Sequence, residues 1–310
     1  MTIADFVHLK VRSAYSLTEG ANKVDAVVAL AKAQAMPAVA VTDRNNLFGA
    51  LEFAQYAAKA GIQPIMGCDL GIRREEEGGI ATASKLPSVD WLTLLVQNEQ
   101  GYLNLMRLVS RAHLDFKTGS VSALPLAELE GHSEGLLAFT GSASSGVGRL
   151  LAAGQVPAAA HMLERLQKSF DNRLYIELQR HGEDGERRLE EAILDLAYTR
   201  NLPLVATNDV HFPKASMYEA HDVLLCIEQG VHIEDPNRRR LTPEYYFKSA
   251  AEMRNAFSDL PEACDNTLTI ARRCAYMPEP RKPILPRYTK LGGRAEKDAL
   301  KEMAENGLAA

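Results

Sequence analysis

Cysteine, tryptophan and long apolar runs are scarce in this chain of 310 residues. The cysteines show no CxxC spacing, so we interpret all four as small buried residues without redox or metal chemistry: Cys68, Cys226, Cys264 and Cys274. No apolar run approaches the roughly 20 residues that cross a bilayer. The first residues also lack a basic region followed by an apolar one. The sequence therefore predicts a cytoplasmic protein without a membrane partner.

The composition is that of a globular protein with a sizeable core, at 46% apolar and 24% charged residues. A net charge of -5 argues against a surface that wraps nucleic acid everywhere. A local basic patch remains compatible with that charge, and Arg238, Arg239 and Arg240 form the clearest basic run. This run has two open interpretations, a solvated turn or a clamp for DNA phosphates.

Apolar segments alternate with stretches of helical periodicity along most of the chain. We expect seven strands, over residues 6–11, 38–42, 63–72, 91–97, 136–140, 174–179 and 204–208. We expect helices after Asn22 and over residues 47–60, 102–113 and 189–198, the second ending at Gly61. Strands that alternate with helices favour parallel pairing, and seven such units close more naturally into a barrel than into an open sheet.

The pattern changes after about Asp235, where helices and turns continue without clear strands. We therefore expect a barrel domain at 1–235 and a mostly helical extension at 236–310. The last residues fall inside an expected helix that begins near Gly293, and no capping residue or polar tail follows. This ending at Ala310 leads us to expect a truncated chain.

Charged side chains cluster at the ends of the expected strands, where barrel enzymes place their chemistry. In the first segment, strict alternation puts His8, Lys10 and Arg12 on one face. A pair of histidines there would form a metal clamp, whereas two cations repel a divalent ion. Near the end of the last strand, Asp209 and His211 share a face, which suits either a metal or a hydrogen-bonded pair.

Further polar residues follow the other strands. They are Glu19, Asp43, Arg44, Asp69, and His181 on the face of Glu177 and Gln179. The remaining histidines stand on helices or loops without an evident partner, and we interpret them as surface or capping residues: His113, His132, His161, His221 and His232.

Six motifs in order along the chain resemble the polymerase and histidinol phosphatase (PHP) domain family. They are residues 8–16, 42–49, 61–67, 101–105, 205–209 and 246–249. More narrowly, the set is similar to the amino-terminal region of bacterial replicative DNA polymerase III alpha subunits. The segments Asn-Leu-Phe-Gly (46–49) and Tyr-Phe-Lys-Ser (246–249) carry this narrower resemblance. The resemblance covers essentially the whole chain and implies a distorted seven-stranded (β/α) barrel.

The resemblance also implies a metal site of nine ligands, from which this sequence departs. Cations stand at three histidine positions, namely Lys10, Arg12 and Arg44, and Trp91 stands at a fourth. The ligand positions that keep their type are Glu19, Asp69, His181, Asp209 and His211. We therefore expect no bound metal, no cofactor and no catalytic residue. Instead we expect the three cations to form an internal salt-bridge cluster with Glu19, Asp69 and Asp209.

Two functions follow from the resemblance. The first is a non-catalytic scaffold that supports the polymerase domain of the same polypeptide and docks the proofreading exonuclease subunit. In that case the parent polypeptide is a DNA-directed DNA polymerase, a nucleotidyltransferase that contacts DNA, while this fragment alone does not extend a primer. The alternative is a metal-dependent phosphoesterase or 3′-5′ exonuclease. It would use zinc, manganese or magnesium at a reduced site of His181, Asp209, His211 and Glu19.

Overall fold

The computed structural model describes residues 3–74, 89–114, 121–282, 288 and 291–309. The chain forms two compact units, Met1–Pro278 and Glu279–Ala310. The second unit contains one described helix, α11 (Glu296–Ala309). The first unit contains the sheet and continues past residue 235, where the sequence pattern changes, to include the two helices that follow.

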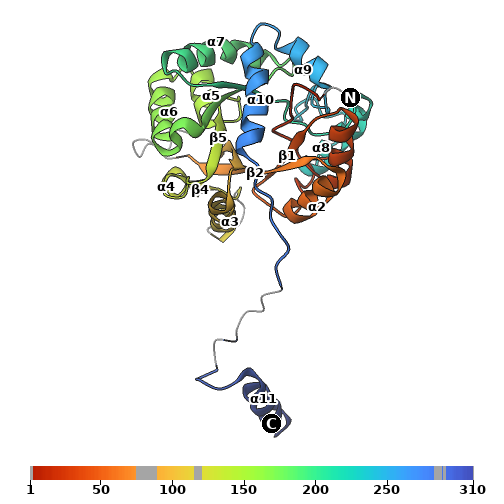
Figure 1. Ribbon diagram of the computed structural model, residues 1–310, viewed down its shortest axis with the longest axis vertical. Helices are drawn as coiled ribbons and strands as arrows, with labels where there is room; N and C mark the ends of the chain where they lie inside the picture. The colour runs from red at the N-terminus through yellow and green to blue at the C-terminus, as the bar shows by residue number, and fades with distance from the viewer. Residues whose placement is uncertain (1–2, 75–88, 115–120, 283–287, 289–290, 310) are drawn as a thin grey trace. The chain divides into compact units, whose positions relative to one another are not determined.

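One sheet of seven strands forms the centre of the first unit (Figure 1). Its strands are β1 (Ala38–Arg44), β2 (Gln63–Arg73), β3 (Val89–Val96), β4 (Leu124–Pro125), β5 (Leu136–Thr140), β6 (Leu174–Leu178) and β7 (Leu204–Ala206). The spatial order is β1-β2-β3-β5-β6-β7, and β4 pairs with β2. The predicted α/β class and curled, barrel-like sheet are confirmed.

The expectation of parallel pairing throughout is wrong at one strand. β3 runs antiparallel to both β2 and β5, while β1, β5, β6 and β7 make parallel pairs. Periodicity shows which residues of a strand are buried, but it carries no information on the strand's direction.

Residues 6–12, the first segment of the chain to pack in the barrel, link the two edges of the sheet. They do not form the regular strand expected over residues 6–11. The backbone of this segment bonds β1 on one side, through Ala40 N to His8 O, and bonds Val210 on the other side. Val7 and Leu9 pack in the inner apolar cluster, whereas Val11 packs in the outer one. The alternation on which the strand was predicted therefore breaks between Leu9 and Val11.

Helices surround this sheet in the first unit. They are α1 (Val24–Ala33), α2 (Ala50–Ala60), α3 (Glu99–Leu114), α4 (Leu126–Glu130), α5 (Gly146–Ala152), α6 (Val156–Phe170), α7 (Asp184–Thr199), α8 (Tyr218–Gln229), α9 (Ala250–Ala256) and α10 (Pro261–Arg273). Two short 3-10 helices are η1 (Asp171–Arg173) and η2 (Ala215–Met217). The predicted end of α2 at Gly61 is confirmed, because Gly61 caps the helix with a left-handed φ of 75°. Among the described helices none is long and apolar enough to cross a membrane.

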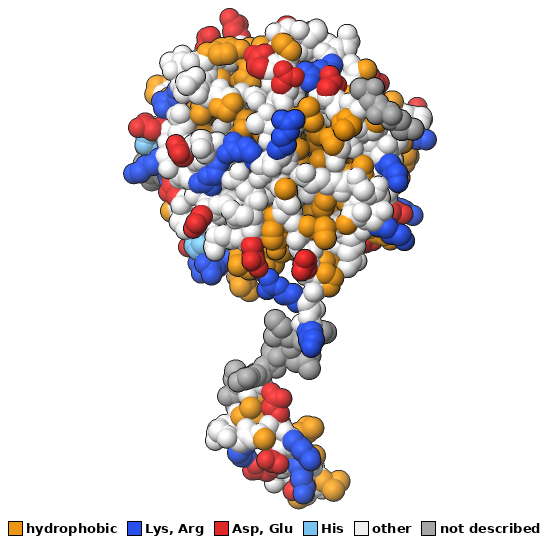
Figure 2. Space-filling model, in the orientation of Figure 1, with side chains coloured by type: hydrophobic (Ala, Val, Ile, Leu, Met, Phe, Trp, Pro, Cys, Tyr) orange, Lys and Arg blue, Asp and Glu red, His pale blue; other side chains and the backbone are white. Residues whose placement is uncertain are grey.

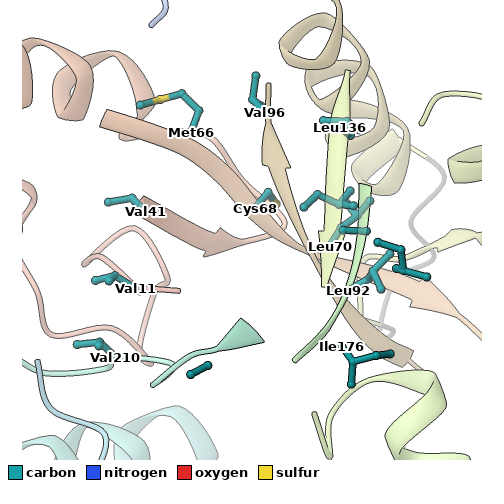
Figure 3. Packing of buried hydrophobic residues seen from close by; sticks show 14 of the residues in the cluster. Val11, Val41, Met66, Cys68, Leu70, Leu92, Val96, Leu136, Ile176 and Val210 are labelled. Atoms are coloured by element: carbon teal, nitrogen blue, oxygen red, sulfur yellow. The ribbon is translucent and has the colours of Figure 1, made fainter. Parts of the chain in front are cut away.

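Two apolar clusters occupy the two faces of the sheet. The outer cluster lies between strands and helices and includes Val41, Cys68 and Leu136, which come from three strands of the sheet (Figure 3). The inner cluster combines alternate strand residues, among them Ala38 and Ala40 of β1, with residues of α10. β1 thus contributes Val39 and Val41 to one cluster and Ala38 and Ala40 to the other, as strand geometry requires.

Helix α10 covers the inner cluster at the amino-terminal ends of the parallel strands. Thr267 accepts a hydrogen bond from Val7 N at 3.1 Å, and Asn266 donates to Leu204 O at 2.8 Å. Gln63, the first residue of β2, donates to the carbonyl of Ala271 at 2.6 Å near the end of the helix. These bonds fix α10 across the end of the barrel, so the carboxyl ends of the strands meet at the opposite end.

Removing the Thr267 hydroxyl tests this attachment. Thr267→Val keeps the shape of the side chain but leaves the buried amide of Val7 without an acceptor, so we expect a loss of about 1–3 kcal/mol in the free energy of unfolding. The matched control is Thr269→Val on the exposed face of α10, which should change stability by at most about 0.5 kcal/mol. Urea denaturation measures both, and equal losses would contradict the role assigned to Thr267.

Candidate functional site

A buried cluster of opposite charges fills the site at the carboxyl ends of the strands. Lys10 and Arg12 come from the first segment, Arg44 ends β1, Asp69 lies in β2, and Asp209 follows β7. We define the central ion-pair cluster as these residues together with the charged side chains that pair with them, namely Glu19, Glu177 and Arg239. These eight groups are four cations and four carboxylates, and Arg239 also lies 3.8 Å from a further carboxylate, Glu228.

Arg12 is the centre of the cluster and is fully buried. Its Nη2 donates to Asp69 Oδ2 at 2.9 Å and to Asp209 Oδ2 at 3.0 Å. Its Nη1 lies 3.8 Å from Glu19 Oε2, and its Nε lies 2.9 Å from Asp209 Oδ1. One guanidinium therefore joins three carboxylates from three separate parts of the chain.

Lys10 extends the cluster toward β6. Its Nζ lies 3.3 Å from Glu177 Oε1 and 3.9 Å from Asp69 Oδ1. Glu177 also accepts from the hydroxyl of Thr207 at 2.6 Å. The ammonium group thus occupies the space between β2 and β6.

Arg44 closes the outer side of the cluster. It pairs with Glu19, and its Nε lies 3.7 Å from Asp69 Oδ2. Its guanidinium stacks over the ring of Trp91 at 4.3 Å, a favourable cation–π geometry. Arg239, from the loop after α8, adds a second cation to Glu19 at 3.1 Å. Arg44 and Trp91, which the resemblance places at two metal-ligand positions, therefore contact each other.

The cations hold the carboxylates of the cluster in their ionised form. Burial alone would raise the pKa of Asp209, but the charges of Arg12 and Lys10 hold that pKa well below its usual range. Burial likewise opposes ionisation of Asp69, and Lys10, Arg12 and Arg44 lower its pKa. The pKa of Glu19 is lowered in the same way by Arg44, Arg12 and Arg239.

The loop that carries Glu19 is fixed by polar contacts and by a glycine. Asp43 accepts hydrogen bonds from the backbone and hydroxyl of Ser13 and from the hydroxyl of Ser16. At Gly20 the loop returns so closely that a Cβ would lie 2.0 Å from Ser13 O. These constraints hold Glu19 against the cluster.

His211 lies beside the cluster as a neutral ring. Burial lowers the pKa of His211 to about 4. Its Nε2 accepts from Arg12 Nε at 3.2 Å, and its Nδ1 donates to the carbonyl of Glu19 at 3.1 Å. That carbonyl also accepts from His221 Nε2 at 2.6 Å. His221 is buried, so its interpretation as a partnerless surface or capping residue is wrong: α8 packs over the Glu19 loop.

His181 stands apart from the cluster. Its Nδ1 faces Glu186 Oε1 at 2.6 Å, and its Nε2 faces the carbonyl of Asn208 at 2.7 Å. The ring of Tyr245 stacks on His181 at 3.7 Å and meets His211 edge-on at 5.3 Å. Tyr245 therefore lies between the two histidines that the resemblance assigned to one site.

The residues present do not fit the metal centre that the family implies. Both ring nitrogens of His181 face oxygen acceptors, and the free lone pair of His211 is taken by Arg12. Asp69 accepts hydrogen bonds from the guanidinium of Arg12 and from the hydroxyl of Thr93. Over the described ranges, no group of three or more His, Cys, Asp or Glu side chains is arranged to hold a metal ion. Arginine and lysine donors fill the space between these carboxylates.

The basic run at Arg238, Arg239 and Arg240 is largely paired within the protein. Arg238 is buried and makes a bidentate contact with Asp222 at 2.5 and 2.6 Å. Arg240 lies 3.6 Å from the same carboxylate, and Arg239 pairs with Glu19. Asp222 and Glu19 thus serve three arginines, and only Arg238 is withdrawn from solvent, because the side chains of Arg239 and Arg240 are 39% and 58% exposed.

Three contributors to the site were absent from the sequence-based site: Arg239, Tyr245 and Glu186. Arg239 and Tyr245 lie on the segment after α8, which packing over the barrel brings to the site. Glu186 could have been found, because it occupies the third position of a capping box at the start of α7, next to His181.

The chain belongs to the PHP domain family, which it matches over residues 8–181. It is 48% identical to the DNA polymerase III subunit alpha of Caulobacter vibrioides over 303 residues, covering 98% of this chain and 26% of that protein. It is 37% identical to the protein of the same name from Rickettsia bellii over 306 residues, covering 99% of this chain and 25% of that protein. The resemblance predicted from the motifs is confirmed, and the chain spans about a quarter of the length of these curated relatives.

The fold also has a likeness among solved structures. A candidate metal-dependent phosphoesterase from Bifidobacterium adolescentis aligns with a TM-score of 0.43 and 13% identity, covering 81% of this chain and 96% of that one.

Truncation of Arg44 tests whether the cluster depends on each member. Arg44→Ala leaves Glu19 and Asp69 short of a cation in a buried site, so we expect a loss of about 3 kcal/mol or more in the free energy of unfolding. Arg188→Ala, on the exposed face of α7, should cost about 0–1 kcal/mol. Denaturant titration measures both variants, and the emission of Trp91, the one tryptophan of the sequence, reports the lost contact directly. Equal, small losses for both variants would rule out the cluster as a stabilising unit.

Proposed function

We propose that this PHP domain is a metal-free, non-catalytic scaffold in a DNA polymerase III alpha subunit. One observation carries the proposal: the guanidinium of Arg12 lies between Asp69, Asp209 and Glu19, three carboxylates at ligand positions of the family. A fixed positive charge there neutralises the carboxylates but cannot activate a water molecule for hydrolysis.

The energetics of such a cluster suit a structural role. A buried ion pair contributes little net stability compared with apolar packing, but removal of one partner is costly because the other charge stays buried. Arg12, Lys10 and Arg44 are charged at all physiological pH values, unlike a metal that can dissociate. The barrel would then keep one fixed shape, which a docking surface requires.

The proposed scaffold has two protein partners. One is the polymerase domain of the same polypeptide, as the names of the relatives suggest, since this chain spans about a quarter of their length. The other is a separate proofreading exonuclease subunit, because a polymerase whose own hydrolytic barrel lacks a metal needs editing from elsewhere. The full polypeptide would act in the cytoplasm as a DNA-directed DNA polymerase and contact DNA there.

The alternative function is a metal-dependent phosphoesterase or 3′-5′ exonuclease with a reduced site. It is supported by the donor types retained at Glu19, Asp69, His181, Asp209 and His211. To bind a metal, these side chains would have to release Arg12 and the other partners described above.

Metal content separates the two functions. We expect purified protein to contain less than one equivalent of zinc, manganese and iron by elemental analysis, because cations occupy the ligand positions. We also expect no hydrolysis of an aryl phosphate ester or of single-stranded DNA, and no change of the melting temperature with a chelator. The scaffold proposal fails if at least one equivalent of metal is present and Asp209→Ala removes both the metal and a measurable hydrolysis rate.

Direct binding tests the docking role. We expect the chain to bind its cognate proofreading exonuclease subunit in titration calorimetry, and to bind DNA only weakly at physiological salt because its net charge is -5. A non-cognate exonuclease of similar size and charge serves as the control. No heat of binding up to high micromolar concentration, together with tight DNA binding, would instead favour a nucleic-acid-handling function.

A further inference from the structure

The end of the barrel opposite the central ion-pair cluster carries a different set of cations. Three arginines converge on residues 167–173, where α6 ends and η1 leads into β6. Arg200, at the end of α7, donates to Gln167 Oε1 at 3.3 Å. Arg173 donates to the carbonyls of Ser133, Leu136 and Ser169, and Arg273, at the end of α10, donates to the carbonyl of Asn172 at 3.0 Å. We call Arg173, Arg200 and Arg273 the basal arginine set.

The charges of the basal arginine set are not neutralised by direct ion pairs. All the hydrogen bonds described for the three guanidinium groups go to neutral acceptors, including the hydroxyl of Tyr175 at 2.9 Å from Arg273. Within the described part of the chain, no carboxylate lies within ion-pair distance of any of the three. In contrast, Arg238, Arg239 and Arg240 are each paired with a carboxylate.

Further charges surround the set. The carboxylates that act on Arg173 are Asp171 and Glu134, and both side chains are exposed. Burial lowers the pKa of Arg173, and the nearby charge of Arg273 lowers it further, while the two carboxylates oppose this. Two exposed cations are adjacent in sequence: Lys168 follows Gln167, and Arg272 precedes Arg273. Together with the basal arginine set, these groups are five cations and two carboxylates, in a chain whose net charge is -5.

The geometry suits an extended polyanion. The three arginines are partly exposed and come from three different elements that meet around residues 167–173. The two small cavities described in the first unit are lined by other residues, near α7 and near α2. Figure 2 shows Lys and Arg side chains, interspersed with Asp and Glu, on the face on which α10 lies. Arginine forks bind phosphate oxygens in pairs, which makes them the preferred contacts to a nucleic acid backbone.

We propose that the basal arginine set binds phosphate groups of the DNA duplex backbone, without reading base sequence. This inference rests on the proposed function, because DNA is the polyanion that a polymerase subunit meets. The basal arginine set would contribute modestly to the affinity for DNA. This agrees with weak binding of DNA by the whole chain at physiological salt, because every phosphate contact weakens as the salt concentration rises. The other explanation is purely structural: the arginines cap carbonyls and offset helix dipoles.

A charge-matched comparison of variants decides between these explanations. The test variant is the double change Arg200→Ala and Arg273→Ala, which spares Arg173 and its three carbonyl contacts. The control is Arg187→Ala with Arg188→Ala, which removes the same charge from the exposed face of α7. A third protein carries Arg200→Lys and Arg273→Lys and so keeps both charges. Fluorescence anisotropy with a labelled duplex of about 20 base pairs measures binding between about 50 and 200 mM salt.

We expect the alanine pair to weaken binding at least fivefold at the lowest salt and to reduce the log–log salt slope by about 2. The lysine pair should remain within about threefold of the parent, and the Arg187 and Arg188 control within about twofold. Equal losses in the test and control pairs, or no measurable binding at low salt, would overturn the proposal. The proposal would also be overturned if polyglutamate competed for binding as strongly as unlabelled duplex, because that result would indicate that the partner of these arginines is an acidic protein.

The same variants keep this inference separate from the proposed function. If the alanine pair binds the exonuclease subunit like the parent while its DNA binding is unchanged, only the basal arginine set loses its role. If the parent chain binds DNA through this set but no exonuclease subunit binds, the docking role fails and the DNA contact stands. Urea midpoints of all variants show whether each one is folded.

Discussion

The rest of the site depends on the burial of one guanidinium group. Arg12 is removed from water and must be matched by carboxylates, and it is matched by Asp69, Asp209 and Glu19. These groups come from β2, from the segment after β7 and from the first loop, so satisfying one charge fixes three parts of the barrel mouth. The tautomer of His211 follows as well, because Arg12 donates to its Nε2. A metal ion would impose similar geometry, but it would bring exchangeable ligands and reactivity that the arginine lacks.

The outer residues of the central ion-pair cluster also match buried carboxylates with cations. Arg44 shares its charge between Glu19 and Asp69 while its flat face covers Trp91. Arg239 adds another cation to Glu19 from a loop far along the sequence. Removal of one cation would leave a carboxylate of the buried site without its partner. The members of the cluster therefore stabilise one another as a set.

The pairing of Lys10, Arg12 and Arg44 with Glu19, Asp69 and Asp209 could be predicted because the family resemblance assigns these positions to one site, where opposite charges that are buried together must pair. The direction of β3 and the burial of His221 could not be predicted, since both depend on which elements pack together across long separations. The same limit applies to Arg239 and Tyr245, which a loop brings to the mouth. For the run of Arg238, Arg239 and Arg240, the sequence shows the charge but not the buried Asp222 that pairs with Arg238.

The position of α10 has a consequence for how the protein is made. Val7 bonds Thr267 across 260 residues of sequence, and Ile270, Ala271 and Cys274 complete the inner cluster begun by Val7 and Leu9. A ribosome releases the chain from its amino terminus, so the first strands and helices emerge long before this helix does. Until α10 arrives, the inner apolar face of the sheet is open to water and to other chains. The final closure of the barrel is therefore a late, long-range step, because its contacts join residues that are far apart in the sequence.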